Sequence, residues 1–157
     1  MIKDYDKHFM KLALKEAKKA YLLDEVPIGA IIVKDNKIIS RGHNLKENKK
    51  DPTLHAEIVA IRKACKKLKS WRLNGCKLYV TIEPCIMCAG AIYQSRIDEV
   101  IFGSFDLKGG AFGSNINLLD IQNINHYPKI KSGIMEKECT EIVKKYFKGK
   151  RKNEKYS

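Results

Sequence analysis

The chain contains an uncharged run, residues 78–82, that ends two residues before Pro84 and limits the folds open to the sequence. Residues 78–82 are β-branched or large and apolar, which predicts a strand buried on both faces. Proline cannot continue a central strand, but its fixed φ suits the first turn of a helix, so a helix should begin at Pro84. The segment therefore predicts a buried strand that is followed at once by a helix.

The rest of the chain repeats this alternation of strands and helices. The expected helices have apolar side chains spaced three and four residues apart, and the expected strands are short β-rich runs. Helices are expected over about 4–23, 55–68, 85–93 and 132–148, and strands over 28–33, 38–43, 78–82 and 99–102. This order predicts a layered α/β fold in which at least part of the sheet is parallel.

The length of the chain, 157 residues, is that of one domain, and no repeat or linker divides it. We expect this domain to span residues 1–150 and residues 151–157 to form a basic, flexible tail. The first residues are charged, and no apolar run is long enough for a signal peptide or a membrane span. The sequence thus predicts a cytoplasmic protein with no membrane partner.

The charge of the chain is strongly unbalanced. There are 31 Lys and Arg residues against 18 Asp and Glu residues, which gives a formal net charge of +13. Such a charge favours a polyanionic partner, first of all a nucleic acid, through attraction and counterion release. Two alternatives stay open: an AT-rich genome also enriches Lys, and the basic C-terminal region also fits a solvated helix end.

The five cysteines fall into two groups. In a reducing compartment disulfides are not expected, so a closely spaced pair favours metal binding or catalysis. Cys85 and Cys88 are the closely spaced pair. Cys65, Cys76 and Cys139 lie in apolar or amphipathic stretches and are expected in the core.

His55 and Glu57 stand at the start of one expected helix, and Cys85 and Cys88 stand at the start of another. One imidazole and two thiolates suit Zn²⁺, and three protein ligands leave the fourth tetrahedral position for water, which is typical of a catalytic site. Residues two apart on a helix differ by about 200° in direction, so His55 and Glu57 cannot both face the metal. We expect His55 to bind the metal and Glu57 to transfer protons.

Two other interpretations of these residues are less consistent with the sequence. A structural zinc site would need a fourth ligand, and none of the remaining candidates has a pairing spacing to the three; these candidates are His43, His126, Cys65, Cys76 and Cys139. A redox pair of Cys85 and Cys88 would leave His55 and Glu57 without a role.

The pattern H-x-E followed by P-C-x-x-C resembles the signature of the zinc nucleobase deaminases. Four longer segments resemble the bacterial tRNA-specific adenosine deaminases, and the similarity covers essentially the whole chain; these segments are 25–30, 51–57, 78–91 and 103–110. The resemblance implies a three-layer α/β/α cytidine-deaminase-like fold with a central mixed sheet of about five strands. It also implies a homodimer with one Zn²⁺ in each subunit.

The activity that the resemblance implies is hydrolysis of adenosine to inosine, with release of ammonia, at the wobble position (34) of an arginine tRNA with anticodon ACG. His55, Cys85 and Cys88 would hold Zn²⁺. Glu57 would deliver protons to the adenine N1 and to the leaving ammonia, and Asn44 would contact the purine ring. An alternative for Asn44 is a plain turn residue.

The resemblance also implies contacts with the tRNA anticodon stem-loop. Asp106 and Lys108 match the RNA-contacting loop of the family, and the Asp106 carboxylate would accept from a ribose 2′-OH, so no DNA partner is expected. Phe147, Lys150 and Arg151 would extend the RNA surface by stacking and phosphate contact.

Two other functions remain open from the sequence. The zinc signature is shared with deaminases of free guanine or cytosine, but a small neutral base gives no reason for a net charge of +13. A catalytically silent RNA-binding subunit could use the same fold, but it would not require Glu57.

Overall fold

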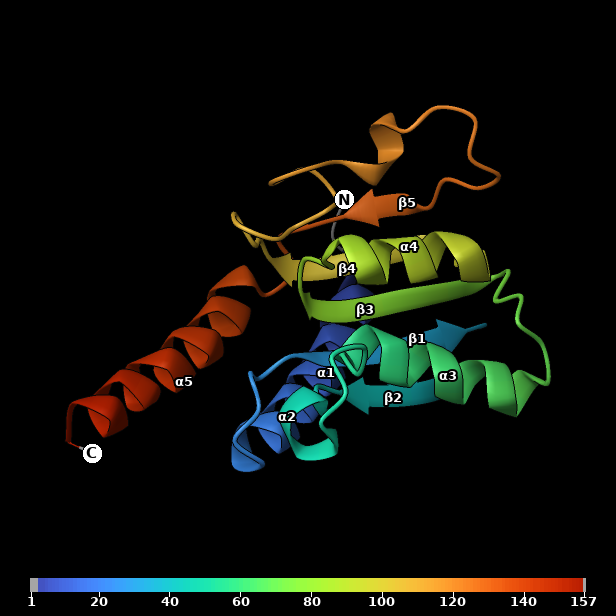
Figure 1. Cartoon of the computed structure of the whole chain (residues 1–157). Coiled ribbons are helices and arrows are strands. Elements are labelled where there is room, and N and C mark those ends of the chain that lie inside the picture. The colour runs from blue at the N-terminus through green and yellow to red at the C-terminus, as the bar shows by residue number, and fades with distance from the viewer. Residues whose placement is uncertain (1–2, 157) are drawn as a thin grey trace.

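The computed structural model describes residues 3–156 and places a five-stranded sheet between two layers of helices (Figure 1). The helices are α1 (Asp4–Leu22), α2 (Lys46–Lys49), α3 (Ala56–Leu68), α4 (Ile86–Ser95), the 3₁₀ helix η1 (Leu118–Asp120) and α5 (Glu136–Tyr156). The strands are β1 (Gly29–Lys34), β2 (Lys37–His43), β3 (Cys76–Ile82), β4 (Glu99–Ser104) and β5 (Lys129–Lys131). The predicted three-layer α/β/α fold with a mixed sheet is confirmed.

The strand order is β2-β1-β3-β4-β5. β1 pairs antiparallel with both β2 and β3, whereas β4 runs parallel to β3 and to β5. The sheet is therefore mixed, and β3 is its central strand. The parallel half arises because α4 carries the chain from the end of β3 back to the start of β4.

Side chains of the central strands alternate between two cores. Leu78 and Val80 enter the core under α3 and α4, while Tyr79 enters the core under α1 and α5. Because both faces of β3 are covered, its sequence is a continuous uncharged run from 78 to 82 rather than an alternating one. The central strand thus fixes both helical layers relative to each other.

α5 differs from the helix predicted over about 132–148, because it covers Glu136–Tyr156. It starts later because Gly133 and Met135 have φ of 80° and 54°, which a right-handed helix does not allow. It continues past the predicted end and includes residues that were expected in a flexible tail. Tyr146 donates a hydrogen bond to the backbone oxygen of Asp24 at 3.1 Å, and this contact holds the far part of α5 beside the end of α1.

None of the helices described between residues 3 and 156 is both long and apolar enough to cross a membrane.

The close approach of α1 to β1 predicts that Gly29→Ala destabilises the fold. A Cβ at this position would lie 2.0 Å from the backbone oxygen of Ala13 and 2.5 Å from the backbone nitrogen of Ala17, so α1 would have to shift. Such overpacking costs about 1–3 kcal/mol, and urea unfolding should show at least about 2 kcal/mol of lost stability.

Gly149→Ala is the matched control, because a Cβ there would meet no heavy atom within 4 Å of the described structure. Alanine favours a helix over glycine by about 1 kcal/mol, so this variant should be as stable as the parent protein or more stable. Equal stability of the Gly29→Ala protein and the parent would contradict the packing described here.

Candidate functional site

The two predicted ligand segments meet because two helices begin side by side. His55 is the residue before α3, with φ −70° and ψ 160°, and Cys85 is the residue before α4, with φ −76° and ψ 176°. Both residues are thus extended, and each lies at the positive end of a helix dipole. That position favours the thiolate form that binds a metal ion.

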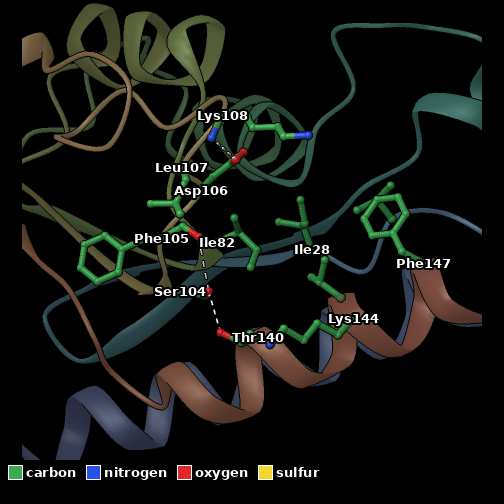
Figure 2. A pocket seen from close by; sticks show the side chains of 12 residues that line it. Ile28, Ile82, Ser104, Phe105, Asp106, Leu107, Lys108, Thr140, Lys144 and Phe147 are labelled. Atoms are coloured by element: carbon green, nitrogen blue, oxygen red, sulfur yellow. Dashed lines mark hydrogen bonds between the residues drawn. The ribbon is translucent and has the colours of Figure 1, made fainter.

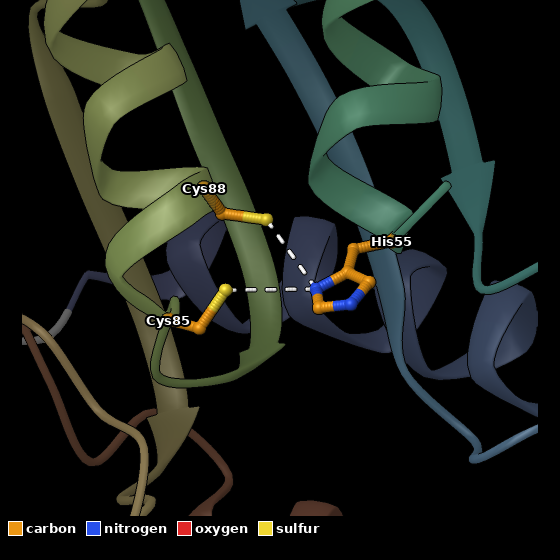
Figure 3. A group of neighbouring side chains, drawn as sticks. All are labelled: His55, Cys85 and Cys88. Carbon is orange, nitrogen blue, oxygen red and sulfur yellow. Dashed lines mark hydrogen bonds between the residues drawn. The ribbon is translucent and has the colours of Figure 1, made fainter. Parts of the chain in front are cut away.

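The distances within this group fit a metal ion. The Sγ atoms of Cys85 and Cys88 each lie 3.6 Å from Nδ1 of His55, and all three ligand atoms lie within 4.8 Å of one another (Figure 3). Two atoms bound tetrahedrally to zinc at the usual Zn–S and Zn–N lengths would be about 3.5 Å apart. The group therefore has the spacing and the donor types of a metal site with three protein ligands.

The electrostatics of the group favour one thiolate, at Cys85, whereas the hydrogen bond to Cys85 and burial raise the pKa of the Cys88 thiol. A hydrogen bond with Cys88 and the neighbouring His55 imidazole lower the pKa of the Cys85 thiol to about 4, although burial acts in the opposite direction. The hydrogen bond to Cys85 also raises the pKa of His55. The Cys85 thiolate thus faces the His55 imidazole. A divalent cation can take the place of the proton that these two groups share.

Glu57 lies in the first turn of α3 and is only 4% exposed. Burial is the main cause that raises the pKa of its carboxyl to about 7, and the charge on Cys85 adds to this effect. A carboxyl with this pKa can both accept and release a proton near neutral pH. Among the described residues, the group of possible ligands is His55, Cys85 and Cys88, so Glu57 stands beside the group without belonging to it.

Asn44 is placed beside this group by the backbone, because Leu45 N–H donates to the Leu54 oxygen at 3.0 Å, next to His55. Its amide is 5% exposed and bonds to the main chain on both sides: Nδ2 donates to the Val26 oxygen at 3.3 Å, and Oδ1 accepts from Lys46 N–H at 3.1 Å. Asn44 therefore has the contacts of a turn residue. Its contact with a purine remains a prediction.

Three of the predicted RNA-contacting residues line one pocket of about 570 Å³. Asp106 and Lys108 line it from the loop after β4, and Phe147 lines it from α5 (Figure 2). The end of β4 and α5 are joined beside this pocket, because the hydroxyls of Ser104 and Thr140 form a hydrogen bond of 2.7 Å. Other residues that line this space had no signal in the sequence; they include Thr140 and Lys144 of α5, Val26 and Ile28 before β1, and Ile82 of β3.

The remaining two predicted RNA contacts lie elsewhere on α5. Lys150 donates to the carboxylate of Asp24 at 2.6 Å, and Arg151 is exposed. Neither residue lines the pocket. The structure therefore groups Asp106, Lys108 and Phe147 and leaves Lys150 and Arg151 further along the helix.

One buried residue beside the site, Glu83, was not predicted from the sequence; it is 3% exposed. It stands between the end of β3 and Pro84 and binds the loop that carries Asp106. A signal was present, since a single acid directly after a buried strand is unusual unless it is paired.

Comparisons with known proteins place similar sequences among the deaminases. The family model of the MafB19-like deaminases matches residues 4–151. The tRNA-specific adenosine deaminase of Bacillus subtilis (strain 168) is 49% identical over 150 residues, which cover 96% of this chain and 93% of that protein. The protein of the same name from Aquifex aeolicus (strain VF5) is 49% identical, over 93% of this chain and 96% of its own length.

Two solved structures are also similar to this chain, with different TM-scores and sequence identities. A structure from work on A-to-I editing by tRNA:A34 deaminases at the wobble position of transfer RNA has a TM-score of 0.84 and 47% identity, with coverage of 86% of this chain and 98% of its own. The guanine deaminase of Bacillus subtilis has a TM-score of 0.60 and 34% identity, with coverage of 74% and 85%.

The ligand geometry predicts that Cys85→Ala loses the metal. With one of three protein ligands removed, the metal content of the purified protein should fall to about a tenth of the parent value or less. Elemental analysis of protein purified without added chelator measures this content. Cys65→Ala is the control, because Cys65 is a partly buried cysteine outside the group, and its metal content should equal that of the parent. Full metal content in the Cys85→Ala protein would exclude the proposed ligand set.

Proposed function

The chain belongs to the family of tRNA-specific adenosine deaminases, and from this premise we propose that it hydrolyses the wobble adenosine of a transfer RNA to inosine and releases ammonia. The observation that carries the proposal is the buried acid Glu57 beside the group of His55, Cys85 and Cys88. Inosine at this position would let one tRNA pair with more codons. The substrate that we propose is the arginine tRNA with anticodon ACG.

We propose Zn²⁺ as the metal, one ion in each subunit, held by His55, Cys85 and Cys88. The mixed nitrogen and sulfur donors and the 3.6 Å separations support zinc rather than magnesium or calcium, which prefer oxygen ligands. When bound, zinc would supply the Lewis acidity that makes water a nucleophile near neutral pH.

Glu57 would carry the protons of the reaction. Its carboxylate would take a proton from the attacking water, give it to N1 of the adenine, and then transfer a second proton from the hydroxyl at C6 to the departing amino group. A raised pKa suits both steps, since the same group has to accept and donate at one pH. The helix start keeps this carboxyl next to the ligands because Glu57 is two residues from His55.

The pocket of Asp106, Lys108 and Phe147 would receive nucleotides of the anticodon loop. Phe147 offers a ring for base stacking, and Lys108 offers a charge to phosphate. Oδ1 of Asp106 already accepts from the backbone N–H groups of Lys108 and Gly109, at 3.2 and 3.1 Å. A carboxylate has further lone pairs, so Asp106 could also accept from a ribose 2′-OH and favour RNA over DNA.

We propose a homodimer, supported by the uncharged helix α4, on which Ile86 is 68% exposed. We also propose that Lys150 and Arg151 extend the RNA surface along α5, and that the enzyme works in the cytoplasm, where tRNA is its partner. The division into a domain over 1–150 and a C-terminal segment over 151–157 likewise remains a prediction.

Deamination of a free base is the second candidate function, because the guanine deaminase of Bacillus subtilis shares 34% identity with this chain. One assay separates the two. Metal-loaded protein is incubated with an arginine-tRNA anticodon stem-loop that bears adenosine at the wobble position, and in parallel with free guanine and free cytosine. We expect inosine in the RNA and no turnover of either base. Turnover of a base with unchanged RNA would contradict the proposal, and so would RNA binding without any turnover.

Glu57→Ala is expected to abolish deamination without loss of the metal. A positioned general acid and base contributes about 10²- to 10⁴-fold, so kcat for the stem-loop should fall by at least about 100-fold. Metal content should remain that of the parent because Glu57 is not one of the three ligands. Loss of the metal together with the activity would instead make Glu57 a ligand. Glu141→Gln, an exposed acid on α5, is the control and should keep full activity.

Asp106→Asn is expected to weaken the discrimination between RNA and DNA. Asparagine keeps an oxygen for the turn contacts with Lys108 and Gly109 but removes the charge that would accept from the 2′-OH. The ratio of kcat/KM for the RNA stem-loop to that for its deoxyribose analogue should fall by about tenfold, as for one lost charged hydrogen bond. An unchanged ratio would show that Asp106 does not contact the 2′-OH. Asp120→Asn, an exposed acid on η1, is the control.

A further inference from the structure

The loop between β4 and η1 carries Asp106 and Lys108 into the pocket but has little regular structure of its own. Gly110 forms an isolated bridge with Cys85, and Phe112 forms another with Asn117. A loop of this kind would adopt many conformations in water unless buried partners hold it. The positions of Asp106 and Lys108 therefore depend on the buried groups that hold this loop.

One buried carboxylate binds the loop at several points. Oε1 of Glu83 accepts from the backbone N–H of Asp106 at 3.2 Å and from the hydroxyl of Ser114. Oε2 accepts from the backbone N–H groups of Phe112 and Ser114, at 3.0 and 3.2 Å. Glu83 is 3% exposed, so these charge-assisted hydrogen bonds are shielded from water.

The backbone of the loop lies directly against the turn that carries Glu83. Ala111 N–H donates to the Pro84 oxygen at 2.8 Å. A Cβ on Gly110 would lie 2.3 Å from the carboxyl carbon of Glu83, so the loop approaches as closely as glycine allows. The loop is thus attached to the same turn that presents Cys85 to the metal site.

We propose that Glu83 is a positioning residue for the RNA substrate. Its carboxylate holds residues 106–114 against the turn that carries Cys85, and so it sets the place of Asp106 and Lys108 relative to His55, Cys85 and Cys88. Because the loop is already ordered in the folded protein, substrate binding does not have to supply the conformational entropy cost of ordering it. The inference rests on the proposed function, because it assigns the held loop to RNA binding.

Glu83→Gln tests this role because an amide cannot replace the carboxylate. Both oxygens of Glu83 accept, so an amide nitrogen in either place would face a backbone N–H group. If the nitrogen replaces Oε1, the N–H of Asp106 loses its acceptor; if it replaces Oε2, the N–H groups of Phe112 and Ser114 lose theirs. The substitution changes no metal ligand. Its effect should be confined to the loop.

Four measurements on the metal-loaded full chain test this expectation: hydrogen exchange, metal content, steady-state kinetics and RNA binding. In Glu83→Gln, hydrogen exchange of the peptide covering 105–116 should accelerate at least about tenfold, while metal content stays that of the parent. KM for the anticodon stem-loop and its dissociation constant, from fluorescence anisotropy, should rise about tenfold, with kcat changed less than about threefold. Ser114→Ala removes one of the contacts and should shift the same quantities in the same direction by less.

Asp6→Asn is the matched control for loss of a buried carboxylate. Asp6 is 0% exposed and accepts from the Tyr79 hydroxyl at 2.7 Å, in the layer of α1 on the other face of the sheet. This variant should lower the melting temperature while leaving loop exchange and KM unchanged. An equal rise of KM in Asp6→Asn and Glu83→Gln would mean that Glu83 is merely structural.

A double-mutant cycle tests whether Glu83 acts through Asp106. If it does, the fold-increase in KM of the Glu83→Gln/Asp106→Asn protein should be well below the product of the fold-increases of the two single variants. Multiplicative effects, unchanged loop exchange or loss of the metal in Glu83→Gln would each overturn the inference. Absence of RNA turnover by the parent protein would overturn the proposed function instead, and the exchange and RNA-binding measurements would still decide the role of Glu83.

Discussion

The starts of α3 and α4 lie within coordination distance of one another, and the arrangement of the whole site depends on this contact. His55 and Cys85 are the residues that precede these helices, and each is held extended by the loop or turn before it. β3, buried on both faces, ends at Ile82 and so fixes where α4 begins. The sheet thus places two helix dipoles at one point, where they favour the negative charge of a thiolate.

Three buried carboxylates have different roles: one suits proton transfer, and two hold segments of the chain by hydrogen bonds. Glu57 lies beside the ligands and keeps a pKa near 7, which suits proton transfer. Glu83 binds the loop on one side of the site, and Glu25 binds the start of α2, accepting from the N–H groups of Glu47 and Asn48 at 2.9 and 2.7 Å. Segments without a core of their own are therefore held by charge-assisted hydrogen bonds to buried acids.

Local patterns predicted the parts of the protein that depend on neighbours in sequence. The uncharged run of 78–82 predicted the central strand, and the spacing of His55, Glu57, Cys85 and Cys88 predicted which side chains would meet. Contacts between distant residues were not predictable in this way. β5 has only three residues and exists because it pairs with β4, and the far part of α5 depends on Asp24, a residue of the α1–β1 loop. The role of Glu83 likewise depends on partners more than twenty positions away.

The proposed chemistry depends on a metal ion that is held by one imidazole and two thiolates and has room for one further ligand from solution. X-ray absorption at the zinc edge of the metal-loaded protein tests it most directly. We expect two sulfur atoms at about 2.3 Å and two light atoms at about 2.0 Å, of which one is an imidazole nitrogen. A third sulfur or a second imidazole would contradict it, because the site would then be closed by the protein and unable to admit a reactant.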